Sequence, residues 1–576
     1  MLHFSRLSHL HTHTQLLQDL LPGQDIFVVG WAMRDLLLDI SEEIIDIDLT
    51  WAGTPESWWE HMSLPETGRG RFRTEKFGTM TLVKKPTEDS AEVSYEITPF
   101  REESGYADNR HPDQIVWSHD LLADSQRRDF TINALYRKPL PASEIQYLDQ
   151  QHILIYKDDD QLIKICKQHG WCVLVDSWTV ILQDHTLIAD YLITNSIPQL
   201  PYCSTEVKNT DAISPSSPIS PSFSLLLDPQ YGLNDLVHRK IRAVGLPTDR
   251  FTEDALRILR WIRFVNMLNQ KLPYIDKQNS GFDIEKKTRQ GMEKTASLIS
   301  ELSAERCHAE LMKVFWWTNP FGYIALLREL HIIPLLFPAL DATIGNRQPV
   351  RYHPFDTYDH TLLTLWHCQQ LCDDPLVKFA MLYHDVGKPE QYAFMDAAIS
   401  LNPENPDRTW YVAHPEISVR LAQEDFGKLA FSGKEIDQIC RYIKHHHRPG
   451  EILDSKPETW TKKLRELLSE GWYDATIHLL SIAIADRLGQ FNPLQKAAIS
   501  ELEVLKTMVT ELYETEGQFT MKQLAINGTD LIQDFWLAPG PHLWELLQKS
   551  FERVITDVPT RNTKEEIYGY LKTFVR

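Results

Sequence analysis

The sequence predicts an α+β protein, in which a small N-terminal domain with a mixed sheet precedes a long helical remainder. Short β-type runs such as "DIFVVG", "TMTLVKK" and "VSYEITPF" alternate with helical patterns such as "AMRDLLLDI" up to about residue 137. Alternation of this kind is typical of a small α/β or α+β domain. From about residue 225 onward apolar residues recur at helical spacing, as Leu256, Leu259 and Ile262 do in "TEDALRILRWIRFVNML". The second part of the chain is therefore expected to be all-α.

The length of 576 residues exceeds what one compact core usually holds and indicates roughly three or four domains. Residues 138–224 separate the two parts described above. This segment begins with a pattern that fits a strand, helix and strand unit, and it ends in "SPSSPISPSFS". A stretch so rich in proline and serine is too polar to pack, and it is expected to be a linker.

Composition excludes several classes of protein. The hydrophobic content of 43% and charged content of 24% are those of a soluble globular protein, and no apolar run is long enough to span a membrane. The N-terminus lacks a signal-peptide pattern, and the seven cysteines form no CxxC pair, so a reducing cytoplasmic location is expected. The net charge of -21 argues against a general nucleic-acid coat. Residues 225–271 are the exception, with eight Lys/Arg against five Asp/Glu.

Two aspartates interrupt an apolar run in "EIIDIDLTWAG". On a β-strand Asp46 and Asp48 project from the same face, so their carboxylates repel each other unless a cation lies between them. Mg²⁺ is the hard ion that carboxylates and nucleotide phosphates share. Glu96, in the apolar alternation "VSYEITPFR", offers a third carboxylate from an adjacent strand. Three carboxylates around two metal ions suit phosphoryl or nucleotidyl transfer, although an isolated DxD motif also fits a solvated strand end.

A strand followed by a tight turn and a helix precedes this motif. In "FVVGWAMRDLLL" we expect the strand to end at Val29, the turn to lie at Gly30 and Trp31, and the helix to begin at Ala32. Backbone N–H groups at such a helix start bind anions, and Arg34 in the first turn would hold a phosphate. An ordinary strand-to-helix turn is the alternative interpretation of this piece alone.

Six sequence blocks in order resemble one enzyme family. These blocks are "VVGWAMRDLLL", "DIDLT", "YEITPFR", "RRDFTINALYR", "LLDPQYGLNDLVHRKIRAVG" and "RFTEDALRILRWIRF". They resemble the class II CCA-adding tRNA nucleotidyltransferases and the related bacterial poly(A) polymerases of the DNA polymerase β superfamily. The resemblance implies a polymerase-β-like nucleotidyltransferase head followed by an all-α neck and body.

The resemblance also implies roles for individual residues. Asp46 and Asp48 match the metal-binding pair, and Glu96 matches the carboxylate that helps to activate the RNA 3'-hydroxyl. Asp254 and Arg257 match the pair that reads the base edge of CTP or ATP, and residues three apart on one helix share a face. The family turn usually carries a second glycine where this chain has Trp31. The expected nucleotide-binding residues are Gly30, Trp31, Arg34, Arg128, Asp129, Asp254, Arg257, Arg260 and Arg263, with Asn133 supporting the turn.

Histidines and aspartates are spread over several predicted helices of the C-terminal half. Imidazoles and carboxylates from separate helices can converge on one metal ion in a helical bundle. A lone histidine on a helix is usually an ordinary core or surface residue, but an adjacent His-Asp pair between an apolar run and "GK" is rare. The residues concerned are His360, His384, Asp385, His414, His445, His446, His447 and Asp486.

The order of these motifs resembles the HD superfamily of metal-dependent phosphohydrolases, which some CCA-adding enzymes carry after the polymerase core. The resemblance implies a divalent transition metal bound by His360, His384, Asp385 and Asp486. It also implies that His414 and either His445 or His446 hold a second metal or contact phosphate. A metal-bound water would attack phosphomonoesters or 2',3'-cyclic phosphates at RNA ends. An HD fold kept only for tRNA docking is the alternative.

The sequence thus predicts a template-independent enzyme that adds or repairs the CCA terminus at the tRNA 3' end with CTP and ATP, using Mg²⁺ in the head. The alternatives are a poly(A) polymerase, an HD phosphohydrolase with a degenerate head, and a non-catalytic tRNA-binding protein. No membrane partner is expected. The expected domains are a head at 1–137, an insertion at 138–224, a helical neck and RNA-binding domain at 225–345, an HD domain at 346–500 and a helical tail at 501–576.

Overall fold

The structure, a computed structural model, describes most of the chain outside the 138–224 segment. The predicted helix of that segment and its Pro/Ser-rich linker up to Ser222 lie outside the described residues, while the last two linker residues, Phe223 and Ser224, belong to a strand. The described residues are 9–10, 13, 26–40, 46–56, 69–74, 78–84, 92–104, 114–140, 155–156, 173–175, 178–180, 223–272, 281–317, 319–348, 354–391, 413–470, 473–517 and 519–574.

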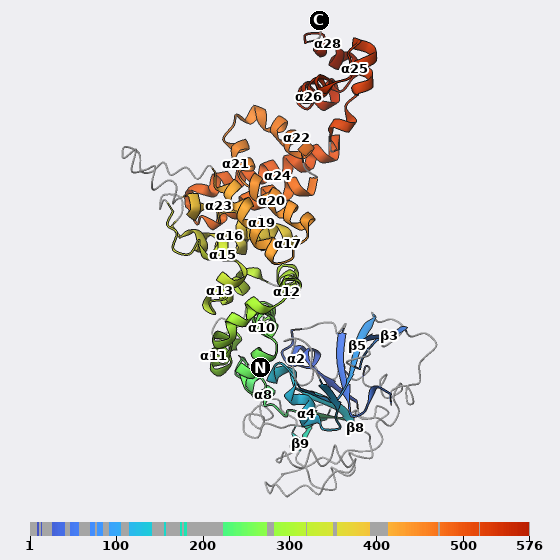
Figure 1. Ribbon diagram of the computed structural model, residues 1–576, viewed down its shortest axis with the longest axis vertical. Coiled ribbons are helices and arrows are strands. Elements are labelled where there is room, and N and C mark those ends of the chain that lie inside the picture. The colour runs from blue at the N-terminus through green and yellow to red at the C-terminus, as the bar shows by residue number, and fades with distance from the viewer. Residues whose placement is uncertain are drawn as a thin grey trace. The chain divides into compact units, whose positions relative to one another are not determined.

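The chain divides into two compact units, Met1–Ile299 and Ser300–Arg576. The first unit contains a mixed β-sheet with helices beside it, and the second is helical throughout its described residues (Figure 1). The predicted α+β fold class is confirmed. Among the described helices, none combines the length and the apolar character that crossing a bilayer requires.

The first unit is organised by a ten-stranded sheet with the order β3-β4-β5-β2-β1-β8-β12-β10-β11-β9. All its pairings are antiparallel except that of β2 with β5. The expected boundary between residues 137 and 138 falls inside β8. The strands are β1 (Ile26–Val29), β2 (Asp46–Trp51), β3 (Arg69–Thr74), β4 (Thr79–Lys84), β5 (Val93–Pro99), β8 (Tyr136–Leu140), β9 (Ile155–Tyr156), β10 (Val173–Val175), β11 (Trp178–Val180) and β12 (Phe223–Leu227).

Alternating burial fixes which face of each central strand meets the core. In β5 the residues alternate between buried and partly exposed, and β1 is buried throughout. The rings of Phe27, Phe100 and Tyr136 pack against one another under the sheet with centroids 5.7 to 6.5 Å apart. Because side chains alternate along a strand, this apolar face leaves the polar residues of β2 and β5 together on the other side.

Short helices and two small strand pairs complete the first unit. Strands β6 (Arg101–Ser104) and β7 (Gln114–Trp117) pair antiparallel, and β13 (Lys240–Ile241) and β14 (Asp283–Ile284) pair parallel. The 3-10 turns are Thr131–Asn133 and Ala296–Glu301. The helices are α2 (Trp31–Leu37), α4 (Leu121–Gln126), α8 (Gly232–Val237), α9 (Pro247–Glu253), α10 (Leu256–Lys271) and α11 (Lys286–Thr295).

The expected single helix through residues 252–268 is wrong, because α9 ends at Glu253 and α10 begins at Leu256. Asp254 has extended backbone angles, and its side chain accepts a hydrogen bond of 3.0 Å from the Leu256 N–H. Aspartate competes in this way for backbone donors and favours helix ends over helix interiors. Asp254 therefore lies at a break, while Arg257 lies in the first turn of α10.

The second unit is a succession of helices, several of which begin at a capping side chain. Asp356, Asp374 and Ser432 each accept a hydrogen bond from the backbone of the helix that they precede. The helices are α12 (Ala304–Trp317), α13 (Pro320–Glu329), α14 (Ile333–Leu336), α15 (Pro338–Asp341), α16 (Thr357–Leu371), α17 (Pro375–Tyr383), α19 (His414–Lys428), α20 (Gly433–His445), α21 (Arg448–Leu453), α22 (Trp460–Glu470), α23 (Tyr473–Gly489), α24 (Lys496–Glu516), α25 (Gly528–Phe535), α26 (Pro541–Val554), α27 (Val558–Arg561) and α28 (Lys564–Leu571).

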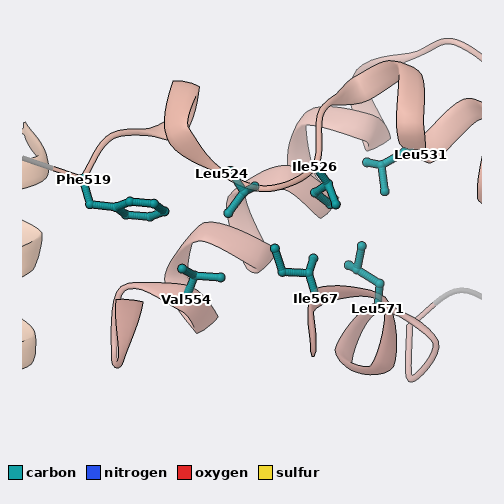
Figure 2. Close-up of a cluster of buried hydrophobic side chains, with 7 residues drawn as sticks. All are labelled: Phe519, Leu524, Ile526, Leu531, Val554, Ile567 and Leu571. Carbon is teal, nitrogen blue, oxygen red and sulfur yellow. The ribbon is translucent and has the colours of Figure 1, made fainter. Parts of the chain in front are cut away.

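The last helices of this unit share a small apolar core of their own. Figure 2 shows side chains from the chain before α25 and from α25, α26 and α28 pointing toward one another. The cluster consists of Phe519, Leu524, Ile526, Leu531, Val554, Ile567 and Leu571. The C-terminal segment is thus packed as a folded element.

Candidate functional site

The three predicted carboxylates of the head lie on two neighbouring strands. Asp46 and Asp48 are partly exposed on one face of β2, and they alternate with Ile47 and Leu49, which are buried on the other face. Asp48 pairs in register with Glu96 of β5, in the sheet's one parallel pairing among the described strands. Register partners on adjacent strands lie about 5 Å apart and share a face. The predicted adjacency is confirmed, and the catalytic roles of these residues stay a prediction.

The turn after β1 places the backbone of Gly30 close to the carboxylate of Asp48. Val29 is the register partner of Asp48, so Gly30 follows directly beside it. Gly30 has φ 85, and a Cβ atom there would lie 2.4 Å from Asp48 Oδ2. Only glycine satisfies both the positive φ and this close approach. The helix begins at Trp31, one residue before the predicted start, and Trp31 is partly exposed at its first position.

Arg34 is held by the protein, with only 1% of its surface exposed. Its Nε donates to Asp35 Oδ1 at 2.7 Å and its NH1 donates to Asn133 Oδ1 at 2.9 Å. The predicted contact of Arg34 with phosphate therefore competes with a buried ion pair. The hydrogen bond from Arg34 to Asn133 helps to fix the position of Arg34. It is one form of the supporting role that the sequence predicts for Asn133.

The charges around Asp48 favour a bound cation. The pKa of Asp48 is raised to about 6. Burial is the largest cause, the negative charges of Asp46 and Glu96 act in the same direction, and the positive charge of Arg128 opposes them. A carboxylate in this position is costly to ionise. A divalent cation with oxygen ligands would remove that cost, so the donor set fits a hard ion such as Mg²⁺.

Arg128 is oriented by two residues that sequence reasoning missed. Its Nε donates to the Tyr136 hydroxyl at 2.8 Å, and its NH2 pairs with Asp124 at 2.9 Å. Asp124 also pairs with Arg127 at 2.6 Å. A buried aspartate within helix α4 carries no sequence motif, so the spacing of Asp124 and Arg128 was the available signal.

Asp129 forms ion pairs with two arginines of helix α10. Arg257 Nε lies 3.4 Å from Asp129 Oδ1, and Arg260 NH2 lies 3.2 Å from Asp129 Oδ2. Burial alone would raise the pKa of Asp129, but Arg260 and Arg257 hold it below its usual value. Arg257 also pairs with Glu253 at 2.6 Å. The predicted nucleotide-binding residues 129, 257 and 260 are thus brought together.

Two other predicted residues have different surroundings. The Arg263 guanidinium lies over the Phe264 ring, 4.7 Å from its centroid. Asp254 is buried at the helix break and caps α10. The structure does not place Asp254 and Arg257 on one face of a single helix.

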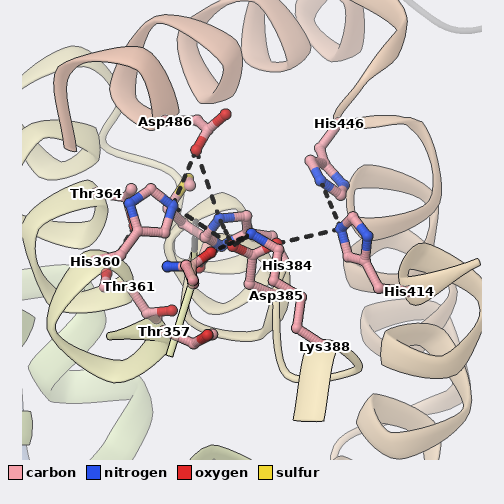
Figure 3. Close-up of polar contacts among 12 residues, drawn as sticks. Thr357, His360, Thr361, Thr364, His384, Asp385, Lys388, His414, His446 and Asp486 are labelled. Carbon is pink, nitrogen blue, oxygen red and sulfur yellow. Dashed lines mark hydrogen bonds and ion pairs between the residues drawn. The ribbon is translucent and has the colours of Figure 1, made fainter. Parts of the chain in front are cut away.

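In the second unit, four helices and a turn build a buried polar centre (Figure 3). His360 lies on α16, Asp486 on α23, and His384 and Asp385 follow α17. A Cβ on Gly489 would lie 2.4 Å from Thr364 Cγ2, so the missing side chain allows α23 to approach α16 closely. A Cβ on Gly387 would lie 2.4 Å from the His414 carbonyl oxygen, which allows the turn to approach α19.

The side chains of this centre converge on two carboxylates. His360 Nε2 lies 3.1 Å from Asp486 Oδ1 and 3.5 Å from Asp385 Oδ2. His384 Nε2 lies 3.3 Å from Asp385 Oδ2 and 3.8 Å from Asp486 Oδ1. His360, His384 and Asp385 offer ligand atoms within 4.8 Å of one another. The four residues predicted as the primary metal set are therefore brought together.

Backbone carbonyls set the tautomers of two imidazoles. The Nδ1–H of His384 donates to the Met381 carbonyl at 2.7 Å, and the Nδ1–H of His446 donates to the Ile443 carbonyl at 2.6 Å. With the proton on Nδ1, Nε2 carries the lone pair that binds a metal ion. Both rings therefore present a ligand atom to the centre.

The charges of this centre pair with one another. Burial alone would lower the pKa of His384, but Asp385 and Asp486 raise it to about 9. Burial would raise the pKa of Asp385, but His384 and Lys388 hold it well below its usual value. Without a metal ion, the carboxylates favour a second proton on His384, at the Nε2 atom that a metal ion would otherwise take. Nitrogen and oxygen donors with such a demand for positive charge fit a divalent transition metal.

A second histidine group adjoins the first. His414 Nε2 lies 3.2 Å from Asp385 Oδ1 and 3.4 Å from His446 Nε2. His414, His446 and His447 form a further set that could hold a metal ion. His445, one of the two predicted alternatives, is not in this set.

Sequence reasoning gave His447 no role and did not name Lys388. Helix α20 ends at His445, and His446 and His447 form the short turn before α21. Lys388 Nζ lies 2.5 Å from Asp385 Oδ2 and donates to Gln348 Oε1 at 2.8 Å. The "GK" after the His-Asp pair was the signal for Lys388.

Three family profiles match successive parts of the chain. The profile described as "Poly A polymerase head domain" matches residues 26–150, and "Probable RNA and SrmB- binding site of polymerase A" matches residues 281–344. The profile of the "HD domain" matches residues 357–489. The two centres described above fall within the first and third of these regions.

Curated relatives carry names of one kind. A "CCA-adding enzyme" of Streptococcus gordonii is 25% identical over 551 residues, which are 96% of this chain and 94% of that relative. A "Multifunctional CCA protein" of Psychromonas ingrahamii is 34% identical over 226 residues, which are 38% of this chain and 49% of that relative. A "CCA-adding enzyme" of Lactobacillus delbrueckii subsp. bulgaricus is 28% identical over 293 residues, or 51% of this chain and 46% of that relative.

Solved structures share the fold. The structure of the Bacillus stearothermophilus CCA-adding enzyme in complex with CTP has a TM-score of 0.51 and 19% identity, over 99% of this chain and 98% of that one. An apo form II of a CCA-adding enzyme has a TM-score of 0.52 and 17% identity, over 99% of this chain and 95% of that one. With a nucleotidyltransferase head, an RNA-binding region and an HD domain matched in this order, the chain is similar along almost its whole length to CCA-adding enzymes.

Proposed function

We propose that this protein adds or repairs the 3'-terminal CCA of tRNA with CTP and ATP, without a nucleic-acid template. The names of its relatives support this substrate class. The observation that carries the proposal is the register of β2 and β5, which sets Asp48 beside Glu96 with Asp46 on the same face. Gly30 meets this cluster from the turn after β1.

Asp46 and Asp48 would hold Mg²⁺, and Glu96 would complete the acidic cluster. The bound metal would neutralise phosphate charge and favour ionisation of the attacking hydroxyl. Glu96, the register partner of Asp48, would accept the proton of the RNA 3'-hydroxyl. The backbone N–H groups after Gly30 form a helix start that favours a bound phosphate, and Arg128 is oriented for another phosphate contact by Asp124 and Tyr136.

The base would be selected by residues at the break between α9 and α10. Arg257 is a planar donor, and Asp254 is an acceptor three residues earlier, so the pair offers the two kinds of group that a base edge recognises. Asp129 and Glu253 hold Arg257 in position. Base recognition through Asp254 requires its capping bond to Leu256 to be shared or released.

The decisive test uses tRNA that ends at the discriminator base. The purified protein is incubated with CTP alone, ATP alone and both together, and products are resolved to single nucleotides. Two additions with CTP and a third only when ATP is present support the proposal. Long A tails would instead show a poly(A) polymerase, and no incorporation would favour a degenerate head.

We further propose that the HD centre binds a divalent transition metal and hydrolyses phosphate esters at RNA ends. His360, His384, Asp385 and Asp486 would hold the metal, which when bound would activate water as the nucleophile. Lys388 would offset negative charge beside Asp385. Hydrolysis of a 2',3'-cyclic phosphate, measured with and without added Mn²⁺ or Ni²⁺, tests this part. Metal binding without hydrolysis would favour a docking role for the domain.

A further inference from the structure

Two exposed phenylalanines meet beside the HD centre. The rings of Phe355 and Phe491 lie 6.4 Å apart with an interplanar angle of 66°. Phe491 is 72% exposed and Phe355 is 37% exposed. We call this pair the aromatic rim. Apolar rings in such exposed positions contribute little to a core and offer their faces to a ligand.

The aromatic rim lies just beyond the ends of the two helices that carry His360 and Asp486. Phe355 lies two residues before α16 and five before His360, and Phe491 lies two residues after α23 and five after Asp486. Five residues of chain span at most about 18 Å, so the rim lies near the metal ligands. Asp486 is 19% exposed while His360, His384 and Asp385 are almost fully buried, so the centre opens on the side of Asp486.

The backbone of Phe491 is strained. Its φ is 48, in the left-handed region that disfavours bulky side chains. Gln490, the preceding residue, keeps its buried side-chain oxygen without a hydrogen-bond partner among the described residues. Strain of this kind in a non-glycine residue persists where the surrounding fold imposes it, and it gathers at ligand sites.

We propose that the aromatic rim binds the nucleobase of the phosphate ester whose phosphate enters the HD centre. This inference rests on the phosphohydrolase activity proposed above and deepens it, because it assigns a binding place to the base beside the hydrolysed phosphate. Every base has a π-face that stacks on an aromatic ring, so recognition here is tolerant of base identity. An RNA 3' end brings a base and a phosphate to these two places together.

Hydrolysis of two esters tests the rim. In 3'-AMP and in glycerol phosphate, water adds to phosphorus and the bond from phosphorus to the ester oxygen breaks, which gives an alcohol and inorganic phosphate. The wild type should show a KM for 3'-AMP about tenfold below that for glycerol phosphate, in line with the usual strength of base stacking. Phe491→Asn, which suits the left-handed backbone, and Phe355→Leu should each bring the two values within about twofold. Trp366→Leu, which removes a 40% exposed aromatic ring from α16, should keep the tenfold preference.

Binding provides a second readout that does not need turnover. AMP and ribose 5-phosphate are titrated calorimetrically into full-length protein with Asp46→Ala and Asp48→Ala, with and without Phe491→Asn. A tighter binding of AMP that Phe491→Asn removes supports the rim even if no ester is hydrolysed, in which case only the proposed hydrolysis fails. Hydrolysis of both esters with equal KM, or an AMP preference that survives both rim substitutions, would overturn the inference and leave the phosphohydrolase in place.

Discussion

The head and the HD centre both gather aspartates around a predicted metal position, but their charges are arranged in opposite ways. In the head, three carboxylates share one face of β2 and β5, and burial together with like charges raises the pKa of Asp48 to about 6. In the HD centre, Asp385 lies 2.5 Å from Lys388 and within 3.5 Å of three imidazoles, and its pKa is held well below the usual value.

This difference indicates which metal ion each site requires. The head needs an external cation before its acids can all ionise, because the described residues around them supply too little positive charge. The HD centre adds imidazole nitrogens and the ammonium of Lys388 to its carboxylates, so it offers nitrogen as well as oxygen ligands to a metal. We therefore expect weakly held, exchangeable Mg²⁺ in the head and a firmly held, softer metal in the HD centre.

Removing both strand aspartates should give the largest effect. Asp46→Ala with Asp48→Ala is expected to reduce nucleotide incorporation into tRNA by about a thousandfold or more, because several kcal/mol of charge stabilisation are lost. Incorporation of labelled CTP measures this. Asp283→Ala, an exposed aspartate paired with Lys240, is the control and should keep activity. Incorporation that survives the double substitution would place the active site elsewhere.

Neutralising Asp385 should separate the two centres. Asp385→Asn keeps the shape of the side chain but removes the charge that three histidines share, so metal affinity should fall about a hundredfold or more. Elemental analysis after dialysis measures the bound metal. Incorporation of CTP by the head should not change. Asp359→Asn, on the same helix as His360 but half-exposed, should retain the metal; equal metal content in both variants would exclude Asp385 as a ligand.

The backbone contact at Gly30 should matter to the head alone. Gly30→Ala forces a Cβ to within 2.4 Å of Asp48 Oδ2 and strains a φ of 85, so incorporation should fall about a hundredfold as the carboxylate is displaced. Gly345→Ala has a similar φ of 74 but no atom within 4 Å of the new Cβ. It tests strain without a clash and should cost only about 1 kcal/mol of stability. Similar activities for the two variants would show that the contact with Asp48 is unimportant.

The smallest expected effect is the pH dependence of the head without divalent metal. Because the folded state raises the pKa of Asp48 from 3.8 to about 6, the folded head favours the protonated acid and loses stability as pH rises from about 4 through 6. Asp48→Asn should remove this loss and exceed the wild type by about 3 kcal/mol at pH 8. Hydrogen exchange of peptides from β1 and β2 in chelator measures the difference. A wild type more stable at pH 8 than at pH 4 in these strands would contradict the assigned repulsion.

The sequence allowed the head to be predicted in detail because strand geometry is regular. Asp46 and Asp48 share a face by the two-residue period, and Glu96 was identified from the same alternation in the next acidic strand. Register could not be read from alternation alone, since it depends on pairing between segments that are far apart in the chain. The structure supplies it as the pairing of Asp48 with Glu96.

Helix ends were harder to predict than helices. The apolar pattern through Leu256, Leu259 and Ile262 gave the correct buried face, but it passes through Asp254 without a sign that the side chain caps a new helix. The choice between His445 and His446 failed to include His447 for a similar reason. Helix α20 ends at His445, and helical periodicity says nothing about residues beyond the last turn.

The backbone acceptors of His384 and His446 have a consequence for how this centre tolerates sequence change. The carbonyls of Met381 and Ile443 belong to the main chain, so replacing either side chain leaves both acceptors in place. The orientation of the two imidazoles therefore depends on the helical backbone and not on a neighbouring side chain that mutation can replace. Substitutions around these rings are free to accumulate as long as the two helical turns persist, and a proline that distorts either turn is the kind of change that would misdirect a ligand.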